Sequence, residues 1–321
     1  DVSHYNGAFE RTYETVLAGV SMRTPMMNIH TVAAGGGSIL HYDGNRFRVG
    51  PDSAGAEPGP CCYRNDGPLT VTDCNLLLGY INPSYFPATF GKTAAQSLDI
   101  KSVKTKFIKL GARISSHKNI EDIAEGFLKV AIENMATAIK KISTEKGYDV
   151  RKYTLVSFGG AGGQHACKVA DRLDIKKIFL HPFAGVLSAF GMGLADHRSI
   201  KEQTIEKILC PKQGPKLKKI NTQLTQKVHS TLHSQGVKNI KTQSHLHIKY
   251  SGSDSTIEVP LASIPIMKQQ FKDLHKQQFG FTSPDKVLIV EKIHVESFGG
   301  GGRGRIDADL TNVKHRIIRS K

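Results

Sequence analysis

The sequence predicts an α/β domain followed by a smaller α+β domain. The first observation is an apolar run, Tyr153–Phe158, that leads into a glycine cluster, a helical pattern and a second apolar run at 177–181. The second is a change of composition near residue 200, after which Gly and Ala become scarce and Lys, Gln, Thr and His dominate. A length of 321 residues allows two or three domains with hydrophobic cores. We expect domains at 1–200 and 201–310, and a flexible tail at 311–321.

Strand, glycine turn, helix and strand form the arrangement in which backbone N–H groups at a helix N-terminus face a phosphate or a nucleotide. The turn holds Gly159, Gly160, Gly162 and Gly163. It contains neither a G-x-G-x-x-G fingerprint nor the Gly-Lys-Ser/Thr of a P-loop. The alternative is a turn whose glycines only let the helix pack closely on a sheet, and the sequence leaves both open.

Composition and charge exclude several classes of protein. No run of eighteen apolar residues is present, so no transmembrane helix is expected. Five cysteines without a C-x-x-C pair favour reduced thiols and a cytoplasmic protein over a disulfide framework or a zinc ribbon. The net charge of +16 raises the question of nucleic acid, but no aromatic platform or recognition motif accompanies it, so we expect no specific nucleic-acid binding. The chain opens with Asp1 and has no leader, which predicts a piece of a longer protein.

Local patterns predict the elements of the first domain. Asn6–Val20 has apolar residues at helical spacing, whereas 27–34 is extended and leads into Gly35, Gly36, Gly37 and Ser38. A hairpin follows around Asp43–Asn45, and the Gly- and Pro-rich stretch 50–68 predicts a rigid loop. Asp73 is either the N-cap of a short helix over 75–78 or a metal or substrate ligand. The longest helical pattern runs over 120–148, with Asn119 as N-cap and Gly147 as its end.

Later patterns predict the remaining elements. Small residues at close spacing over 182–195 predict a helix packed tightly against a sheet or a nucleotide. Helices are expected at 217–235 and 266–280, paired strands at 244–250 and 255–259, and another strand at 287–295. The glycine-rich segment from Gly299 predicts a flexible exit.

Several motifs in this order resemble the hydantoinase A family. They are Asp1-Val-Ser3, His30-Thr-Val-Ala-Ala-Gly-Gly-Gly-Ser38, Val49-Gly-Pro-Asp-Ser-Ala-Gly55, Thr70-Val-Thr-Asp73, Phe158-Gly-Gly-Ala-Gly162 with His165-Ala166, and Leu194-Ala-Asp196. The Gly163-Gln164-His165-Ala166 ending is most similar to the ATP-dependent 5-oxoprolinase branch. The resemblance is strong over about 1–200 and weak over 201–300.

The resemblance implies part of an actin, sugar-kinase and Hsp70-type α/β lobe, with a small α+β domain after it. It implies ATP- and Mg²⁺-dependent opening of a cyclic amide, 5-oxo-L-proline to L-glutamate, in glutathione metabolism. It also implies a hydantoinase B-type region, fused or as a partner, and a homo-oligomer. A piece lacking the first ATP lobe is expected to be inactive alone and prone to association through exposed apolar surface.

The resemblance also assigns site residues. Gly159, Gly160 and Gly162 would line the adenosine or ribose side of a nucleotide, and Gly35, Gly36, Gly37 and Ser38 a second surface nearer the phosphates or substrate. Asp1, His30, Asp73 and His165 are the candidate catalytic residues, with His30, His165 and Asp1 as candidate ligands of an additional divalent metal. Each histidine could instead be only a satisfied hydrogen bonder. Two alternatives remain: another hydantoinase A-type reaction (N-methylhydantoin hydrolysis or ATP-dependent carboxylation) and a non-catalytic remnant acting as an interaction module.

Overall fold

The computed structural model describes residues 1–7, 10–12, 15–17, 20–22, 26–91, 93–114 and 119–300. Two compact units divide the chain, residues 1–187 and residues 188–321. The predicted boundary near residue 200 falls inside a strand of the second unit, β11 (His197–Ile208). The predicted tail at 311–321 and the glycine-rich exit from residue 301 lie outside the described residues.

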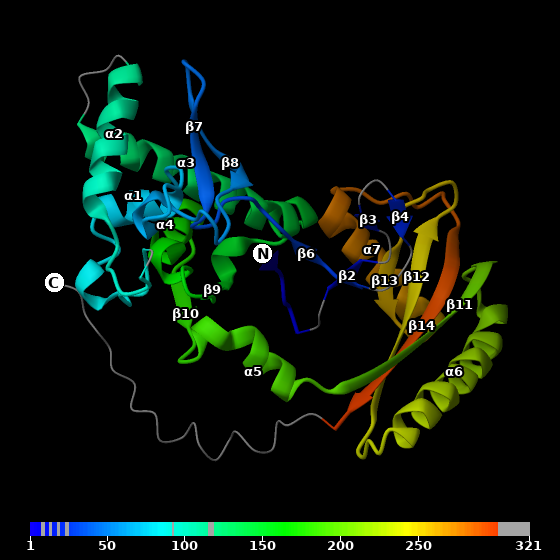
Figure 1. Cartoon of the computed structure of the whole chain (residues 1–321). Coiled ribbons are helices and arrows are strands. Elements are labelled where there is room, and N and C mark those ends of the chain that lie inside the picture. Colours follow the sequence, from blue (N-terminus) through cyan, green and yellow to red (C-terminus); the bar gives the residue numbers. More distant parts are fainter. Residues whose placement is uncertain are drawn as a thin grey trace. The chain divides into compact units, whose positions relative to one another are not determined.

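Short antiparallel strand pairs open the first unit (Figure 1). They are β1 (Val2–Ser3) with β6 (Ile29–His30), β2 (Arg11–Thr12) with β5 (Met26–Met27), and β3 (Thr15–Leu17) with β4 (Val20–Met22). The helix predicted over Asn6–Val20 is therefore wrong wherever this segment is described. Its β-branched residues favour extended backbone, and its strands pair with β4 and β5, which local periodicity does not reveal.

The predicted hairpin is confirmed as β7 (Ser38–Tyr42) paired with β8 (Phe47–Ser53). The stretch after it is irregular apart from the 3₁₀ turn η1 (Cys61–Tyr63), and it leads to the short helix α1 (Val71–Leu77). Two longer helices follow, α2 (Ile100–Ile114) and α3 (Ile120–Ile142). Asn119 caps α3 as predicted, because its side chain accepts a 2.7 Å hydrogen bond from the Asp122 N–H. The helix ends at Ile142, and Gly147 instead caps the 3₁₀ turn η3 (Thr144–Lys146).

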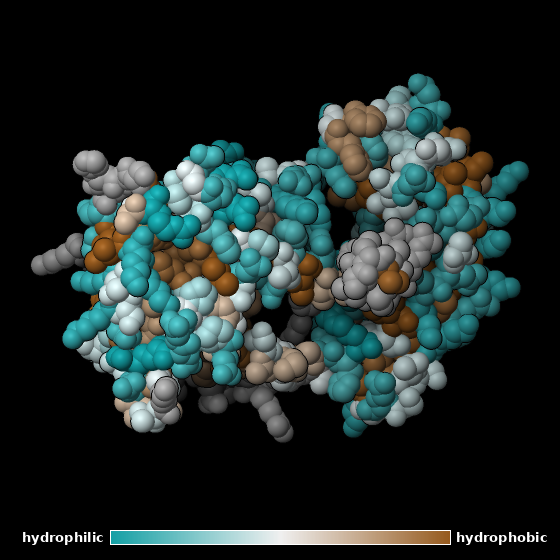
Figure 2. All heavy atoms as spheres, turned by 45° about the horizontal axis from the view of Figure 1, so that its top comes forward, coloured by the Kyte–Doolittle hydropathy of each residue, from teal (hydrophilic) through white to brown (hydrophobic). Residues whose placement is uncertain are grey.

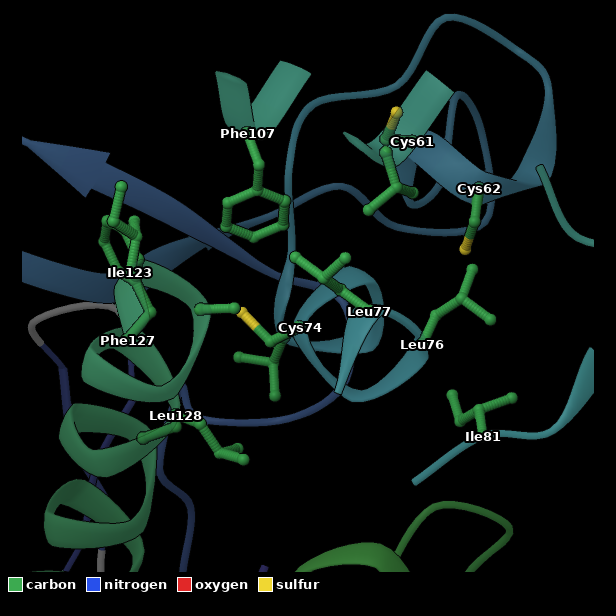
Figure 3. Close-up of a cluster of buried hydrophobic side chains, with 14 of the residues drawn as sticks. Cys61, Cys62, Cys74, Leu76, Leu77, Ile81, Phe107, Ile123, Phe127 and Leu128 are labelled. Carbon is green, nitrogen blue, oxygen red and sulfur yellow. The ribbon is translucent and has the colours of Figure 1, made fainter. Parts of the chain in front are cut away.

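The main core of the first unit forms where α1, α2 and α3 meet. Figure 3 shows Phe107 from α2 and Phe127 from α3 turned toward Cys74 and Leu77 of α1. Cys61 and Cys62 are buried in the same cluster. Burial raises the pKa of the Cys61 thiol to about 11 and also raises that of Cys62, so both cysteines pack rather than react.

A βαβ arrangement completes the first unit, as predicted. Strands β9 (Thr154–Ser157) and β10 (Lys177–Leu180) are parallel, and helix α4 (Gly163–Leu173) connects them. Apolar residues of α4 pack with Ile132 and Ala136 of α3 in a second cluster. Several apolar side chains of the strands and the segments after them stay exposed: Val156, Phe158, Phe179, Leu180 and Phe183. The apolar surface expected from the sequence is present here.

The second unit is built on one antiparallel sheet with the strand order β11-β14-β12-β13. Its other strands are β12 (Lys241–Tyr250), β13 (Ile257–Pro260) and β14 (Leu288–Gly299), and its long helices are α6 (Gly214–Ser234) and α7 (Ile264–Phe279). Helix α6 runs along β11 and β14 (Figure 1), and both long helices bury apolar residues against the sheet. The predicted helices and strands of this part are thereby confirmed.

The helix predicted within 182–195 exists as α5 (Leu187–Leu194), but none of its residues is buried. Its small residues therefore do not pack tightly against a sheet. Further 3₁₀ turns are η2 (Pro83–Tyr85), η4 (Val150–Lys152), η5 (Ala184–Val186) and η6 (Pro211–Gln213).

Hydrophilic residues cover most of the face shown in Figure 2, with hydrophobic residues in smaller patches between them. Among the helices that the structure describes, none is long and apolar enough to cross a membrane. The five cysteines are all free thiols.

Candidate functional site

The glycine segment before β7 is attached to the start of α1. The Gly36 carbonyl oxygen accepts a 2.9 Å hydrogen bond from the Thr72 N–H. A Cβ at Gly36 would lie 2.7 Å from Thr72 Oγ1, closer than a side chain tolerates. Glycine is needed at position 36 because α1 approaches the backbone there.

Ser38 closes this segment into a tight turn. Its hydroxyl oxygen accepts a hydrogen bond from the Gly35 N–H at 3.0 Å, and its own N–H donates to the Gly35 carbonyl oxygen at 3.0 Å. The Gly37 carbonyl oxygen accepts from the Ala54 N–H at 2.8 Å, which ties the turn to the end of β8. The Ser38 side chain is thus buried in the turn, and Gly35 is the exposed member of the segment.

The second glycine segment, between β9 and α4, contains glycines with different physical roles. Gly159 has φ +86°, a left-handed conformation that favours glycine, and its N–H donates to the Ala184 carbonyl oxygen at 2.8 Å. A Cβ at Gly162 would meet the Phe158 carbonyl oxygen at 2.5 Å, so Gly162 is needed for packing. A Cβ at Gly160 would meet no atom within 4 Å. Neither the packing nor the φ angle of the described chain explains a glycine at 160.

Asn75 of α1 connects this second segment to the first. Its Nδ2 donates to Gln164 Oε1 at 2.6 Å and lies 3.4 Å from His165 Nε2. Thr72, which bonds to Gly36, stands three residues before Asn75, about one turn of helix away. One face of α1 therefore brings the two predicted glycine segments to the same place in the first unit. Asn75 is not one of the site residues predicted from the sequence.

Two buried polar atoms at this junction make no hydrogen bond with any residue that the structure describes, Asn75 Oδ1 and His165 Nδ1. A buried polar atom without a partner costs about 1–3 kcal/mol, so such atoms commonly mark a ligand or water position. Burial, followed by the positive charge of Lys168, lowers the pKa of His165. The imidazole is therefore neutral at physiological pH and offers one donor and one acceptor.

Asp73 has a structural environment. One carboxylate oxygen accepts from the Cys62 N–H at 2.9 Å. The other accepts from the N–H groups of Cys61, at 3.1 Å, and Thr70, at 2.8 Å, and from the Thr70 hydroxyl at 2.9 Å. The N-cap of α1 is Thr70, three residues before Asp73, which corrects the capping alternative of the sequence analysis. Burial raises the pKa of Asp73, and its hydrogen bonds oppose that effect.

Asp1 immediately precedes β1, and His30 is the last residue of β6, the strand that pairs with β1. Val2 lies opposite His30 in the β1–β6 register, and Asp1 Oδ1 accepts a 2.6 Å hydrogen bond from the Thr31 hydroxyl. His165 lies on α4, and in the described part of the chain it does not join Asp1 and His30 in a group of potential metal ligands. Because His30 pairs with Val2 and side chains alternate along a strand, Asp1 and His30 point to opposite faces of this strand pair. The described chain therefore does not gather the four predicted catalytic residues in one site.

One group of potential metal ligands is present among the described residues, and it lies in the second unit. Glu202, His247 and His294 each offer a ligand atom, and these atoms lie within 4.8 Å of one another. Alternation along a strand shows which residues of that strand share a face. It does not show which strands pair, so the sequence alone does not bring these three residues together.

An open hollow of about 480 Å³ lies beside α2 and contains none of the predicted site residues. Its cations are engaged within the protein: Lys106 with Asp66 at 3.1 Å, and Arg64 with Asp99 at 3.3 Å. This hollow therefore offers a ligand little free charge.

Comparison with known proteins supplies the family. The model of the Hydantoinase/oxoprolinase family matches residues 1–201. The chain belongs to this family. The match includes both glycine segments and α1, so the junction of these elements lies in the part of the chain that defines the family.

The chain is 39% identical to a 5-oxoprolinase of Saccharomyces cerevisiae over 98% of its own length and 26% of that protein. It is 38% identical to 5-oxoprolinase 1 of Arabidopsis thaliana, over 93% of this chain and 25% of the relative. The chain thus spans about a quarter of the length of these curated relatives. The caprolactamase subunit alpha of Pseudomonas jessenii is 31% identical over 85% of this chain and 40% of that subunit.

Solved structures of similar fold include the ATP-dependent caprolactamase from Pseudomonas jessenii. It superposes with a TM-score of 0.80 at 28% identity, over 90% of this chain and 43% of that one. An acetone carboxylase in its nucleotide-free state gives a TM-score of 0.59 at 22% identity, over 92% and 44%. Both likenesses support a mixed α/β fold shared with these proteins, and the second carries information on fold alone.

Proposed function

We propose that this chain is the part of an ATP-dependent cyclic amide hydrolase that carries nucleotide-facing glycine turns. The proposed reaction converts 5-oxo-L-proline to L-glutamate with hydrolysis of ATP to ADP and phosphate. The observation that carries the proposal is the 36–39% identity to proteins named 5-oxoprolinase over more than nine-tenths of the chain. A lactam carbonyl is a poor electrophile, and ATP with Mg²⁺ supplies the activation that hydrolysis of this bond requires.

Gly160 supports a nucleotide at the second glycine turn. A Cβ there would point into open space, and the Gly160 N–H makes no backbone hydrogen bond with any described residue. An exposed N–H beside the first turn of α4 suits a phosphate or ribose oxygen. In this proposal Gly159, Gly160 and Gly162 hold one side of the nucleotide. Gly35, Gly36, Gly37 and Ser38 supply a second backbone surface.

Asn75 and His165 are proposed to position substrate or nucleotide by hydrogen bonds. The neutral His165 imidazole offers Nδ1, and Asn75 offers Oδ1, and both atoms lack a partner among the described residues. Asp1 and His30 remain proposed participants in proton transfer or Mg²⁺ binding, each acting separately, because the strand register directs their side chains to opposite faces. Asp73 is proposed to hold the loop and helix that carry these groups, because its carboxylate bonds to the backbone of both.

The named relatives are about four times as long as this chain, so the complete reaction is assigned to a protein of that size. We propose that the missing functions belong to a hydantoinase B-type region and a second nucleotide lobe of the actin type, in a homo-oligomer. The 321 residues alone are then expected to bind nucleotide weakly and to show no turnover.

Calorimetric titration of Mg·ATP and ADP into the purified chain tests the nucleotide site. Gly160→Val is expected to abolish binding without disturbing the fold, because the space around its Cβ is open. Gly214→Val is the matched control, since that Cβ is equally unhindered but lies at the start of α6 in the second unit. Binding that survives Gly160→Val, or a folded chain without nucleotide affinity, would count against this site.

A chimera tests the reaction itself. The 321 residues replace the corresponding 26% of the Saccharomyces cerevisiae 5-oxoprolinase, with which they share 39% identity, and glutamate formation from 5-oxoproline is measured with ADP release. Coupled formation of both products supports the proposal, provided that the Gly160→Val chimera forms neither. A chimera that is folded and oligomeric but inert on 5-oxoproline would contradict it.

A second candidate is hydrolysis of a different lactam. The TM-score of 0.80 to an ATP-dependent caprolactamase favours this alternative over other reactions of the family. The two candidates are distinguished by measuring ATP hydrolysis by the same chimera with 5-oxoproline and with the seven-membered lactam ε-caprolactam. A pocket that fits one ring size is expected to stimulate ATP hydrolysis only with the lactam of that size.

A further inference from the structure

Three strands of the second unit bring a carboxylate and two imidazoles onto one face of the sheet. Glu202 of β11 lies directly opposite His294 of β14. His245 of β12 lies opposite His294 on the other side. His247 stands two residues further along β12, and because side chains alternate it points to the same face as His245. The imidazole rings of His247 and His294 have centroids 6.4 Å apart.

We propose that Glu202, His247 and His294 form a binding site for Zn²⁺ that ties β11, β12 and β14 together. Their ligand atoms lie within 4.8 Å of one another. Zinc binds nitrogen and oxygen ligands at about 2.0–2.2 Å, so ligand atoms around one ion lie about 3–4 Å apart. Binding would require side-chain rotations that bring the three groups to that separation.

Burial favours a transition metal over Mg²⁺ at this position. His247 is 4% exposed and His294 is 1% exposed, whereas the Glu202 side chain is 27% exposed and leaves an approach from solvent. Two imidazoles and one carboxylate are ligands of zinc sites, and Mg²⁺ prefers oxygen ligands with several retained waters. The predicted Mg²⁺ of an ATP reaction would therefore not occupy this site.

The hydrogen bonds of the cluster are compatible with metal binding. Glu202 accepts from His294 Nδ1 at 2.9 Å and from Lys292 Nζ at 2.9 Å. A metal ion would replace the proton between Glu202 and His294, and Lys292 would keep the second carboxylate oxygen.

The competing interpretation is that these residues form only an ion-pair network. Lys292 weakens any cation site by its own charge, and Glu202 already joins Lys292 to His294. The cluster also includes His247, whose ring centroid lies 6.4 Å from that of His294. His245 lies on the same face but pairs with Glu258 at 3.4 Å and is not one of the three grouped ligands.

The test is a Zn²⁺ titration of the metal-stripped chain against a chromophoric chelator. One equivalent is expected to bind, and Glu202→Gln and His247→Ala are expected to weaken that binding by about 100-fold or more, since second-sphere changes alone cost 10–100-fold. Glu202→Gln preserves the shape of a partly exposed side chain, so it still tests Zn²⁺ binding if His247→Ala does not fold.

The matched control is His233→Ala. His229 and His233 stand one turn apart on the surface of α6 and are the obvious adventitious imidazole pair. This variant is expected to retain the tight equivalent. Co²⁺ in the same chain is expected to give visible d–d absorption that Glu202→Gln removes.

Equal Zn²⁺ affinity in wild type and Glu202→Gln would overturn the proposal, as would loss of the tight equivalent in His233→Ala. Absence of stoichiometric binding by a folded wild-type chain would overturn it as well. A Zn²⁺-dependent rise in the unfolding temperature, present in wild type and absent from Glu202→Gln, is the second readout. None of these results depends on nucleotide binding.

Discussion

The Asp73 carboxylate gathers four hydrogen bonds at the start of α1, and its replacement distinguishes a structural role from a catalytic one. In Asp73→Asn an amide oxygen in place of the oxygen that bonds to Cys61 and Thr70 can keep three of these bonds. The NH₂ group then faces the Cys62 N–H, which loses its acceptor at 2.9 Å. Asp73→Ala removes the acceptor of the Cys62 N–H, the Thr70 N–H and the Thr70 hydroxyl, whereas the Cys61 N–H keeps the Pro68 carbonyl oxygen at 3.0 Å.

The magnitude follows from the number of buried donors left without an acceptor. Each costs about 1–3 kcal/mol, so Asp73→Asn is expected to lower the free energy of unfolding by about 1–3 kcal/mol. Asp73→Ala strands two backbone N–H groups and one hydroxyl, and the expected loss of about 3 kcal/mol or more approaches the total stability of a domain. The Ala variant is therefore expected to be largely unfolded in this region.

Thiol labelling in urea reads out this region directly. Cys61, Cys62 and Cys74 are buried beside Asp73, and burial raises the pKa of each thiol, so they react only when the core around α1 opens. Brief labelling followed by mass spectrometry gives the urea midpoint of that opening. In Asp73→Asn the midpoint is expected to move to lower urea.

Asp99→Asn is the matched control at the start of α2. Asp99 accepts from the Ser102 N–H at 3.0 Å and the Ser102 hydroxyl at 2.8 Å. It is partly exposed and Asn keeps one acceptor oxygen, so this replacement is expected to cost less than about 1 kcal/mol. A labelling midpoint for Asp73→Asn equal to that of wild type would refute the structural reasoning. Loss of activity in the corresponding chimera with an unchanged midpoint would restore Asp73 to the catalytic candidates.

Three further predictions concern other parts of the chain. The Phe271 side chain is 1% exposed, and its ring centroid lies 5.0 Å from that of Tyr250. Phe271→Ala is therefore expected to lower the free energy of unfolding by about 3–5 kcal/mol, measured by urea unfolding with circular dichroism. Phe281 is 57% exposed, and Phe281→Ala is expected to change that free energy little. Folding lowers the pKa of His165, so below pH 6.5 protons bind the unfolded chain preferentially and the free energy of unfolding of wild type is expected to fall. In His165→Gln the free energy of unfolding is expected to depend less on pH, and identical pH profiles for the two proteins would refute this. In the folded chain Cys167, which is exposed, is expected to react rapidly with a thiol reagent while Cys61, Cys62 and Cys74 stay protected; rapid reaction of all four would contradict the packing.

The elements that the sequence predicted correctly are those with strong local patterns. Helices α3, α6 and α7 each bury one apolar face, and the hairpin β7–β8 has its turn residues in place. The helix predicted over residues 6–20 was wrong because the apolar spacing fits a helix, whereas the described strands of this segment, β2 and β3, pair with β5 and β4. Secondary structure there depends on a partner segment, and helical periodicity cannot report one.

The site was predicted in part for the same reason. Glycine clusters are local, so both turns were found, but the contact that joins them is between Asn75 and Gln164, 89 residues apart. The sequence allows Asp73 to be either a helix N-cap or a ligand, because two of its hydrogen-bond donors, Cys61 and Cys62, come from a loop whose path the sequence does not show. The group of Glu202, His247 and His294 depends on the register of three strands, which a single sequence does not contain.

The glycines of one motif can be required for different physical reasons, and these reasons decide which substitution tests ligand binding rather than folding. At Gly36 and Gly162 an added Cβ would collide with Thr72 and with the Phe158 carbonyl oxygen, so loss of binding there would report damage to the fold. Gly159 has a positive φ, so a side chain would strain it whatever it contacts. Gly160 meets neither restriction. A defect that appears in Gly160→Val while thiol protection of the core is unchanged can therefore be assigned to the ligand that approaches this backbone.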